Sequence, residues 1–257
     1  MQTIYVIKNP LKNVFFALCI TILCLSVSAA ADNEESEYSQ AEILLWLTDQ
    51  LKTVGQPTTF TYEFRRTGTM DSSFSDTVRF AVTAVKEDGM KSAKLEFFTG
   101  ARRIDVSAAD NTSINPVLKI YLQGDVYEMN RLTDPAGASK ERWRYFQRQI
   151  KRALADTANV ETLTVEFSGQ QYSAHKVTLS PFLRDVKLSD PSIRNGSTRR
   201  LYDGLVAKTY TVIVSDDLPG YLFRIETVTP DKSNARDPLI REVLQLVEID
   251  VGVPDVD

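Results

Sequence analysis

Cysteine and histidine are nearly absent from this chain. Among its 257 residues there are two cysteines, Cys19 and Cys24, and one histidine, His175. Both cysteines lie in a leader segment that we expect to be removed, so the mature chain would contain none. Zinc sites built from cysteine and histidine are therefore excluded, apart from unusual carboxylate-rich ones, and cysteine nucleophiles are excluded as well. We expect no metal site and no cofactor.

Phosphate-binding loops and a catalytic serine elbow are also absent. Neither Gly-x-Gly-x-x-Gly nor Gly-x-x-x-x-Gly-Lys occurs, so we expect no bound nucleotide. Gly-x-Ser-x-Gly is absent too, and His175 lies within an alternating segment, which favours a sheet residue over a triad member. With a net charge of −4, the chain is not expected to bind nucleic acid through its overall field.

Carboxylate chemistry stays open at this point, because the two acids of a glycosidase are set by their separation in space. The acidic residues of this chain fall mostly at turns and at outward positions of expected strands, where solvated surface is the simpler interpretation. No pair stands out, and we name no catalytic residue.

The first thirty residues have the order of a secretory signal peptide. Lys8 and Lys12 precede an apolar run over 14–27, which is shorter than the ~20 residues that a membrane-spanning helix needs. Small residues follow at Ser28–Ala31. This pattern predicts a cleaved signal peptide over residues 1–31, and a retained anchor is the alternative.

The cut is expected before Ala31 or Asp32, and a lipid anchor at Cys24 is not expected, because small residues do not precede it. We therefore expect an exported, soluble product, periplasmic in a Gram-negative host and secreted otherwise. The mature part, residues 32–257, is expected to form a single β-rich domain without disulfides.

Two amphipathic helices are expected. Ser39 and Glu42 have the spacing of a capping box, and a helix should run to Val54 with a stripe of Ile43, Leu47, Leu51 and Val54. The second helix is expected over residues 139–155. Its apolar stripe consists of Trp143, Phe146, Ile150 and Leu154.

The remaining segments alternate with period two, as strands do. Strands are expected at residues 60–64, 78–82, 95–98, 104–106, 117–122, 126–129, 163–167, 172–179, 207–214, 221–228 and 243–251. Pro219-Gly220 predicts a type II turn, residues 183–204 form a long polar loop, and residues 239–240 also fit a helical period. The fold class is α+β: a strongly curved antiparallel sheet, half-open and barrel-like, of about ten strands.

Aromatic residues on the strand faces have two interpretations. They form an ordinary core, which carries the larger weight, or they line an apolar cavity on the concave side of the curved sheet. The abundance of tyrosine favours a partly wet lining. The candidate lining residues are Phe60, Tyr62, Phe64, Phe80, Phe97, Tyr121, Tyr210 and Phe223.

The second helix carries a row of basic residues at every fourth position: Lys140, Arg144, Arg148 and Arg152. Such a row could meet anionic lipid head groups or an acidic partner protein. The simpler interpretation is the solvated face of an amphipathic helix, and we favour it.

The order of a signal peptide, an N-terminal helix over 39–54, antiparallel strands, a mid-chain helix and further strands resembles the LolA/LolB-type lipoprotein-carrier superfamily. The resemblance implies a half-open barrel with helices as a lid over a lipid cavity. It covers most of the mature chain as architecture only, so no functional residue is carried over. The polar loop at 183–204 and the basic mid-chain helix depart from the family.

Three functions follow, in order of preference. The first is an exported soluble protein that binds an apolar or amphiphilic ligand, such as a lipid or a lipoprotein, on the concave face of the sheet. The second is a non-enzymatic envelope interaction or scaffold protein with a filled core and a protein partner. The third is a carboxylate-based hydrolase.

Overall fold

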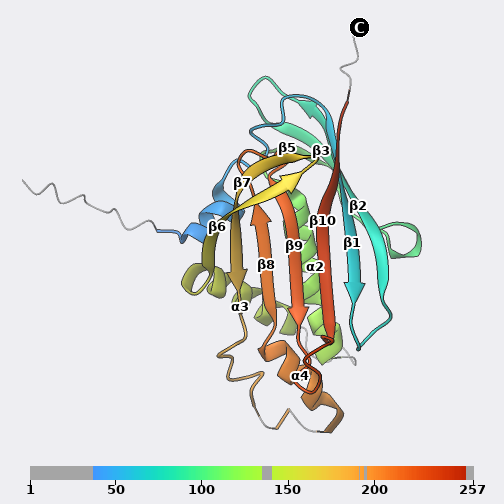
Figure 1. The fold of residues 1–257 in the computed structure, drawn as a ribbon, viewed down its shortest axis with the longest axis vertical. Coiled ribbons are helices and arrows are strands. Elements are labelled where there is room, and N and C mark those ends of the chain that lie inside the picture. Colours follow the sequence, from blue (N-terminus) through green and yellow to red (C-terminus); the bar gives the residue numbers. More distant parts are fainter. Residues whose placement is uncertain (1–36, 135–140, 191, 194–195, 253–257) are drawn as a thin grey trace, which may run out of the picture. The chain divides into compact units, whose positions relative to one another are not determined.

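A ten-stranded antiparallel sheet organises the part of the chain that the computed structural model describes, residues 37–134, 141–190, 192–193 and 196–252 (Figure 1). The expected signal peptide and Lys140 lie outside these residues. The strands are β1 (Thr58–Thr67), β2 (Phe74–Val85), β3 (Lys91–Phe97), β4 (Ile104–Asp105), β5 (Ala109–Thr112), β6 (Asn159–Phe167), β7 (Gln170–Leu179), β8 (Thr209–Val214), β9 (Leu222–Thr229) and β10 (Ile240–Val251).

The strand order is β4-β3-β2-β1-β10-β9-β8-β7-β6, and β5 pairs with β3. The first long strand and the last are therefore neighbours: Thr58 lies opposite Val251, and Thr67 lies opposite Arg241. The sheet is curved and does not close on itself, since β4 and β6 are its edges. The expected α+β class and curved, unclosed antiparallel sheet are confirmed.

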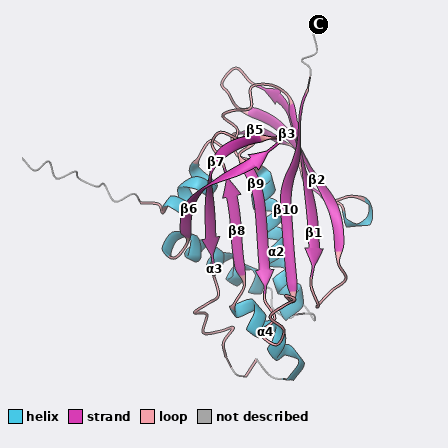
Figure 2. Ribbon diagram, in the orientation of Figure 1, coloured by secondary structure: helices cyan, strands magenta, loops and turns pink. Residues whose placement is uncertain are grey.

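The described part of the chain forms four α-helices beside the sheet, where the sequence predicted two; Figure 2 distinguishes helices from strands by colour. They are α1 (Gln40–Glu42), α2 (Pro116–Thr133), α3 (Arg142–Asp156) and α4 (Arg199–Val206), and short turns of other helix types are η1 (Ile43–Leu47), η2 (Gly100–Arg102) and η3 (Gly196–Thr198). The helix expected at 139–155 is confirmed as α3, with Phe146, Ile150 and Leu154 buried and Trp143 partly buried.

The N-terminal helix begins as expected but ends early. The Ser39 hydroxyl accepts from the Glu42 amide at 3.1 Å, and the Glu42 carboxylate accepts from the Ser39 amide at 3.0 Å, so the capping box is present. The helical stretch ends at Leu47, because Thr48 is extended and donates its hydroxyl to the Ile43 carbonyl. The hydroxyl groups of serine and threonine compete in this way with the backbone hydrogen bonds of a helix. The expected continuation to Val54 is wrong.

The strands expected at 117–122 and 126–129 are wrong, because both segments belong to α2. The Asn115 side chain caps this helix by accepting from the Val117 amide at 3.0 Å, and Pro116 occupies its first turn. Gly124 suggested a hairpin turn in the middle of this segment. A single glycine inside a helix, however, lowers the stability of the helix by only about 1 kcal/mol. Asn-Pro at the start was the signal that could have identified the helix.

The loop expected at 183–204 was predicted too long, because α4 begins at Arg199. Leu201, Tyr202 and Leu205 are buried on one face of this helix, and their helical spacing was hidden by the polar residues around them.

The turn between β8 and β9 agrees with the sequence prediction. The Tyr221 amide donates to the Leu218 carbonyl at 2.9 Å, and β10 starts at Ile240 as a strand rather than a helix.

The core lies between the sheet and α2. Aromatic and aliphatic side chains at alternate positions of β1, β2, β8 and β10 point to the same face, and α2 covers that face with Val117, Leu118 and Tyr121. The α3 helix packs against α2, and its residues Tyr145 and Ala153 line a pocket together with Leu179 of β7. This layering decides where a ligand has room.

Candidate functional site

The residues predicted to line a concave cavity lie in the packed core. Seven of the eight are at most 4% exposed, namely Phe60, Tyr62, Phe64, Phe80, Phe97, Tyr121 and Tyr210. Phe223 is partly buried beside a bulge of β9. The rings contact one another: Phe60 stacks on Phe80 at 5.6 Å, and Phe64 lies 6.5 Å from Tyr121. Tyr121 belongs to α2, so its assignment to a strand is wrong.

The tyrosine hydroxyls of this group are satisfied by the protein itself. Tyr62 accepts from the Asn115 amide group at 3.0 Å, and Tyr210 donates to Asp125 at 2.6 Å. Tyr121 lies 3.0 Å from the Thr227 hydroxyl. Burial raises the pKa of Tyr121 and Tyr210 well above the ordinary value, and nearby carboxylates raise it further. These phenols therefore stay neutral and anchor α2 to the sheet.

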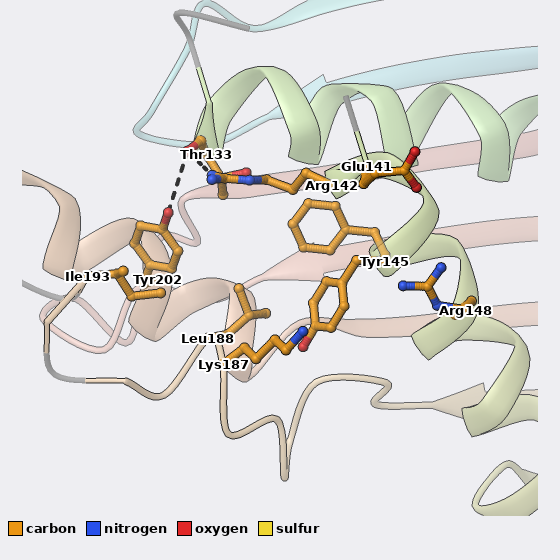
Figure 3. A pocket seen from close by; sticks show the side chains of 10 residues that line it. Thr133, Glu141, Arg142, Tyr145, Arg148, Lys187, Leu188, Ile193 and Tyr202 are labelled. Atoms are coloured by element: carbon orange, nitrogen blue, oxygen red, sulfur yellow. Dashed lines mark hydrogen bonds between the residues drawn. The ribbon is translucent and has the colours of Figure 1, made fainter. Parts of the chain in front are cut away.

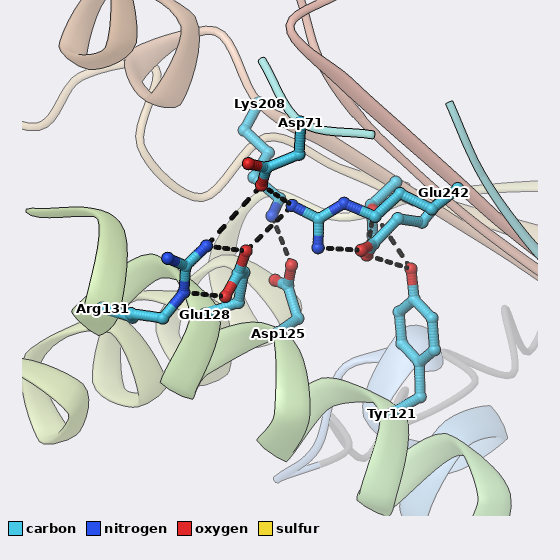
Figure 4. Close-up of polar contacts among 9 residues, drawn as sticks. Asp71, Tyr121, Asp125, Glu128, Arg131, Lys208 and Glu242 are labelled. Atoms are coloured by element: carbon cyan, nitrogen blue, oxygen red, sulfur yellow. Dashed lines mark hydrogen bonds and ion pairs between the residues drawn. The ribbon is translucent and has the colours of Figure 1, made fainter. Parts of the chain in front are cut away.

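A buried network of charges joins α2 to strands β1 and β10 and to Lys208, just before β8 (Figure 4). Lys208 pairs with Asp125 at 2.5 Å, and their side chains are only 5% and 3% exposed. Arg66 contacts Glu128 at 2.8 Å and Glu242 at 3.2 Å. Every carboxylate named here has a cationic partner, as burial requires.

The carboxyls of the network have opposite pKa shifts. Burial raises the pKa of Glu242, and the nearby charge of Asp125 adds to this, while Lys208 and Arg66 act against it. For Glu128, burial acts to raise the pKa, but the hydrogen bonds from Arg131 and Arg66 outweigh it and lower the pKa to about 2. Split pKa values also occur at catalytic carboxylates, but these groups are engaged by cations and tyrosines inside the core.

Open space is found between the helices, in a groove that we call the helix groove. It lies between α1–η1, α2, α3 and the segment around β5, and its cavity volume is about 700 Å³. Drug-sized and lipid-like ligands occupy pockets of about 300–1,000 Å³. Its apolar lining consists of Trp46, Ala109, Ile114, Pro116, Leu122, Val126, Ile150 and Leu154.

The helix groove also presents polar groups that have no partner. The Gln123 side-chain nitrogen is buried and has no hydrogen-bond partner among the described residues. Lys119 and Lys151 lie exposed at the rim, and neither forms an ion pair within the described ranges. Glu42, the acid of the groove, is already engaged by the Ser39 amide. The groove thus combines an apolar floor with one buried donor and two cations.

The basic row of α3 is only partly described, because Lys140 lies outside the described residues. Arg144 pairs with Glu141 at 2.6 Å, and Arg152 lies 3.5 Å from Asp156. Arg148 is exposed and lines a small pocket of about 300 Å³ with Arg142 and Lys187 (Figure 3). Binding of an anionic surface by this row stays a prediction.

His175 lies on β7, opposite Thr162 and Val214, as a sheet residue. Among the described residues, no three histidine, cysteine, aspartate or glutamate side chains gather as a metal site would require. Within the same part of the chain, no helix is long and apolar enough to cross a membrane.

Sequence reasoning missed the helix groove because it assigned α2 to strands. Leu122 and Val126 were placed in a hairpin, whereas one turn of helix brings them to the same side as Gln123 and Lys119. The signal that could have revealed them was the helical capping sequence Asn115-Pro116.

No protein-family model matches the sequence, and no curated protein matches it. Among solved structures, one match is a LolA superfamily protein from Nitrosomonas europaea, with 8% identity and a TM-score of 0.21, covering 84% of this chain and 95% of that one. Another is a domain named as a putative outer membrane lipoprotein-sorting protein from Vibrio parahaemolyticus, with 12% identity and a TM-score of 0.25, covering 77% and 86%. With likeness this low, function has to be inferred from the geometry of the chain itself.

Proposed function

We propose that this protein is an exported carrier that binds a single-chain anionic amphiphile in the helix groove. The observation that carries the proposal is the groove itself: an apolar cavity of about 700 Å³ with two unpaired lysines at its rim, within the part of the chain that is described. An apolar chain would cover Trp46, Ile114 and Leu122, and its head group would lie near Lys119 and Lys151. Export is supported by the leader pattern at residues 1–31.

The ligand class follows from the polar groups of the groove. A buried amide without a partner costs about 1–3 kcal/mol, which a ligand that accepts its hydrogen bond would recover. Gln123 therefore favours a ligand with an oxygen acceptor next to its apolar chain, such as a carboxylate or an ester. The two lysines favour a negative head group over a neutral one.

The position of the ligand differs from the expectation based on the sequence alone. The inner face of the sheet is occupied by α2 and by the charge network, and the helix groove between the helices is the site that we propose instead. The packed inner face is also what a non-enzymatic envelope interaction protein would have, and this remains the second candidate function. Catalysis by a carboxylate pair is not proposed.

A titration with a dansyl-labelled fatty acid tests the proposal. The purified protein should bind the probe saturably, and an unlabelled fatty acid should displace it. Leu122→Trp fills the groove from the middle of α2 and should abolish binding. Val247→Trp adds the same bulk at an exposed position of β10 and should leave binding unchanged, with circular dichroism confirming that both variants are folded.

The head-group assignment is tested with the double variant Lys119→Gln/Lys151→Gln. It should weaken binding of the anionic probe about fivefold to tenfold, and leave binding of a fatty alcohol of equal length unchanged. Lys94→Gln removes an exposed lysine on β3 and serves as the control. Absence of displaceable binding by the wild-type protein would refute the carrier function.

A further inference from the structure

The loop after β7 buries two apolar side chains and exposes two others. Phe182 is fully buried and Leu188 is 4% exposed, so both are anchored in the core. Leu183 and Val186, between them, are 63% and 82% exposed, the highest values among the large hydrophobic residues described. Exposed aliphatic side chains placed so close together are typical of a binding surface.

This exposure is built into a well-held loop. The Asp185 carboxylate accepts from the amides of Lys187 and Leu188, each at 2.9 Å, and Tyr145 of α3 donates its hydroxyl to the same carboxylate. The ring of Phe182 packs edge-on against Phe146 at 5.7 Å. The loop is therefore fixed to α3 in a shape that directs Leu183 and Val186 outward.

Cations from two elements surround these aliphatic side chains. Arg152 of α3, with Arg184 and Lys187 of the loop, lines one pocket of about 790 Å³ together with Leu183 and Val186. Lys187 also joins the neighbouring small pocket that contains Arg148, where Figure 3 shows both side chains beside Tyr145. We call this surface the basic lip; its residues are Arg148, Arg152, Leu183, Arg184, Val186 and Lys187.

The cations of the basic lip are largely uncompensated. Within the described residues, neither Arg148 nor Arg184 forms an ion pair, and the pair of Arg152 with Asp156 is exposed on both sides. The α3 sequence as a whole has five basic residues and one acidic residue, although the full chain has a net charge of −4. Positive charge is thus concentrated on α3, although the chain as a whole is acidic.

We propose that the basic lip docks on the surface of an anionic lipid bilayer. Lipid phosphates would meet Arg148, Arg152 and Arg184, and the two aliphatic side chains would enter the head-group region. A surface that joins cations to exposed aliphatic residues is what peripheral membrane binding needs, because each contribution alone is weak. An acidic protein partner is the alternative occupant, and the vesicle experiment below distinguishes the two.

Sedimentation with vesicles tests this proposal, separately from ligand binding in the helix groove. The wild-type protein should bind vesicles that contain phosphatidylglycerol and should not bind pure phosphatidylcholine vesicles. Arg148→Gln/Arg184→Gln should weaken binding about 25-fold, since each cation near an anionic surface contributes about fivefold. Leu183→Ser/Val186→Ser should weaken it about tenfold.

The matched control is Arg103→Gln/Ile104→Ser, which removes an exposed cation and an exposed aliphatic side chain at the β4 edge of the sheet. It should bind vesicles like the wild type. Equal binding to both vesicle types, or binding that neither lip variant reduces, would overturn the proposal. It would also be overturned if vesicles are not bound at all and the lip arginines instead retain an acidic protein.

Discussion

Arg66 shows how a single side chain can depend on contacts that sequence cannot reveal. Its guanidinium is 11% exposed and touches Asp71, Glu128 and Glu242 at 2.8, 2.8 and 3.2 Å. Glu242 is 176 positions away in the chain. In the sequence, Arg66 is simply one of two adjacent arginines, because its ion-pair partners are set by the strand pairing of β1 with β10 and by the position of α2.

The charge network predicts a specific response to acid. Glu128 has its pKa lowered to about 2 from the usual 4.5, so its contribution to stability is present above about pH 4.5 and is lost as the pH falls toward 2. The pKa of Glu242 is raised, so its contribution to stability has the opposite pH dependence. That contribution is lost as the pH rises above the pKa that Glu242 has in the unfolded chain. The free energy of unfolding of Glu128→Gln, measured with urea, should therefore fall less steeply than that of the wild type between about pH 5 and 2. This is roughly the range that separates the usual and the lowered pKa of Glu128.

The control for this experiment is Glu96→Gln, which removes an exposed carboxylate of β3 that forms no ion pair within the described residues. It should keep the slope of the wild type. A slope for Glu128→Gln that equals the wild-type slope would mean that the Arg66–Glu128–Arg131 contacts do not hold in solution.

At the scale of elements, the sequence was informative where one local pattern decided the structure. Helix α3 and the capping box at Ser39 were predicted, because an uninterrupted apolar stripe and a capping sequence act locally. Helix α2 was missed for a physical reason: its buried face includes Asp125, which pairs with Lys208 across the core. A charged residue on the buried face, next to Gly124, breaks the apolar stripe that identifies a helix.

The turn between β8 and β9 makes a prediction at this scale. Gly220 has φ of +78°, and a Cβ there would lie 2.5 Å from the Phe60 ring. Gly220→Ala should therefore lower the free energy of unfolding by about 3 kcal/mol, through backbone strain and overpacking together. Thermal and urea unfolding measure this directly.

Gly89 offers a matched comparison, because its φ is +82° and a Cβ there would meet nothing within 4 Å. Gly89→Ala should lower the free energy of unfolding only through backbone strain, by about 1 kcal/mol. Equal costs at the two glycines would show that the packing of Phe60 under the turn contributes nothing.

At the scale of the whole molecule, the sequence predicted the α+β class and the curved antiparallel sheet, but not which surface stays open. Alternation along strands shows that a face is apolar, and it cannot show whether a helix or a ligand covers it. Phe60, Tyr62 and Tyr210 were named as apolar strand-face residues that form a core or line a cavity, and all three are buried. That α2 covers this face, and that an open groove lies between the helices, depends on tertiary packing.

The central claim, that an amphiphile binds in the helix groove, is tested most directly by tryptophan quenching. The chain has two tryptophans: Trp46 lines the groove, whereas Trp143 packs against Tyr127 at 6.1 Å, outside the groove lining. A brominated fatty acid, titrated into the Trp143→Phe variant, should quench Trp46 saturably, and the Trp46→Phe variant should show much weaker quenching of Trp143. Unquenched Trp46, or equal quenching of both tryptophans, would contradict binding in the groove.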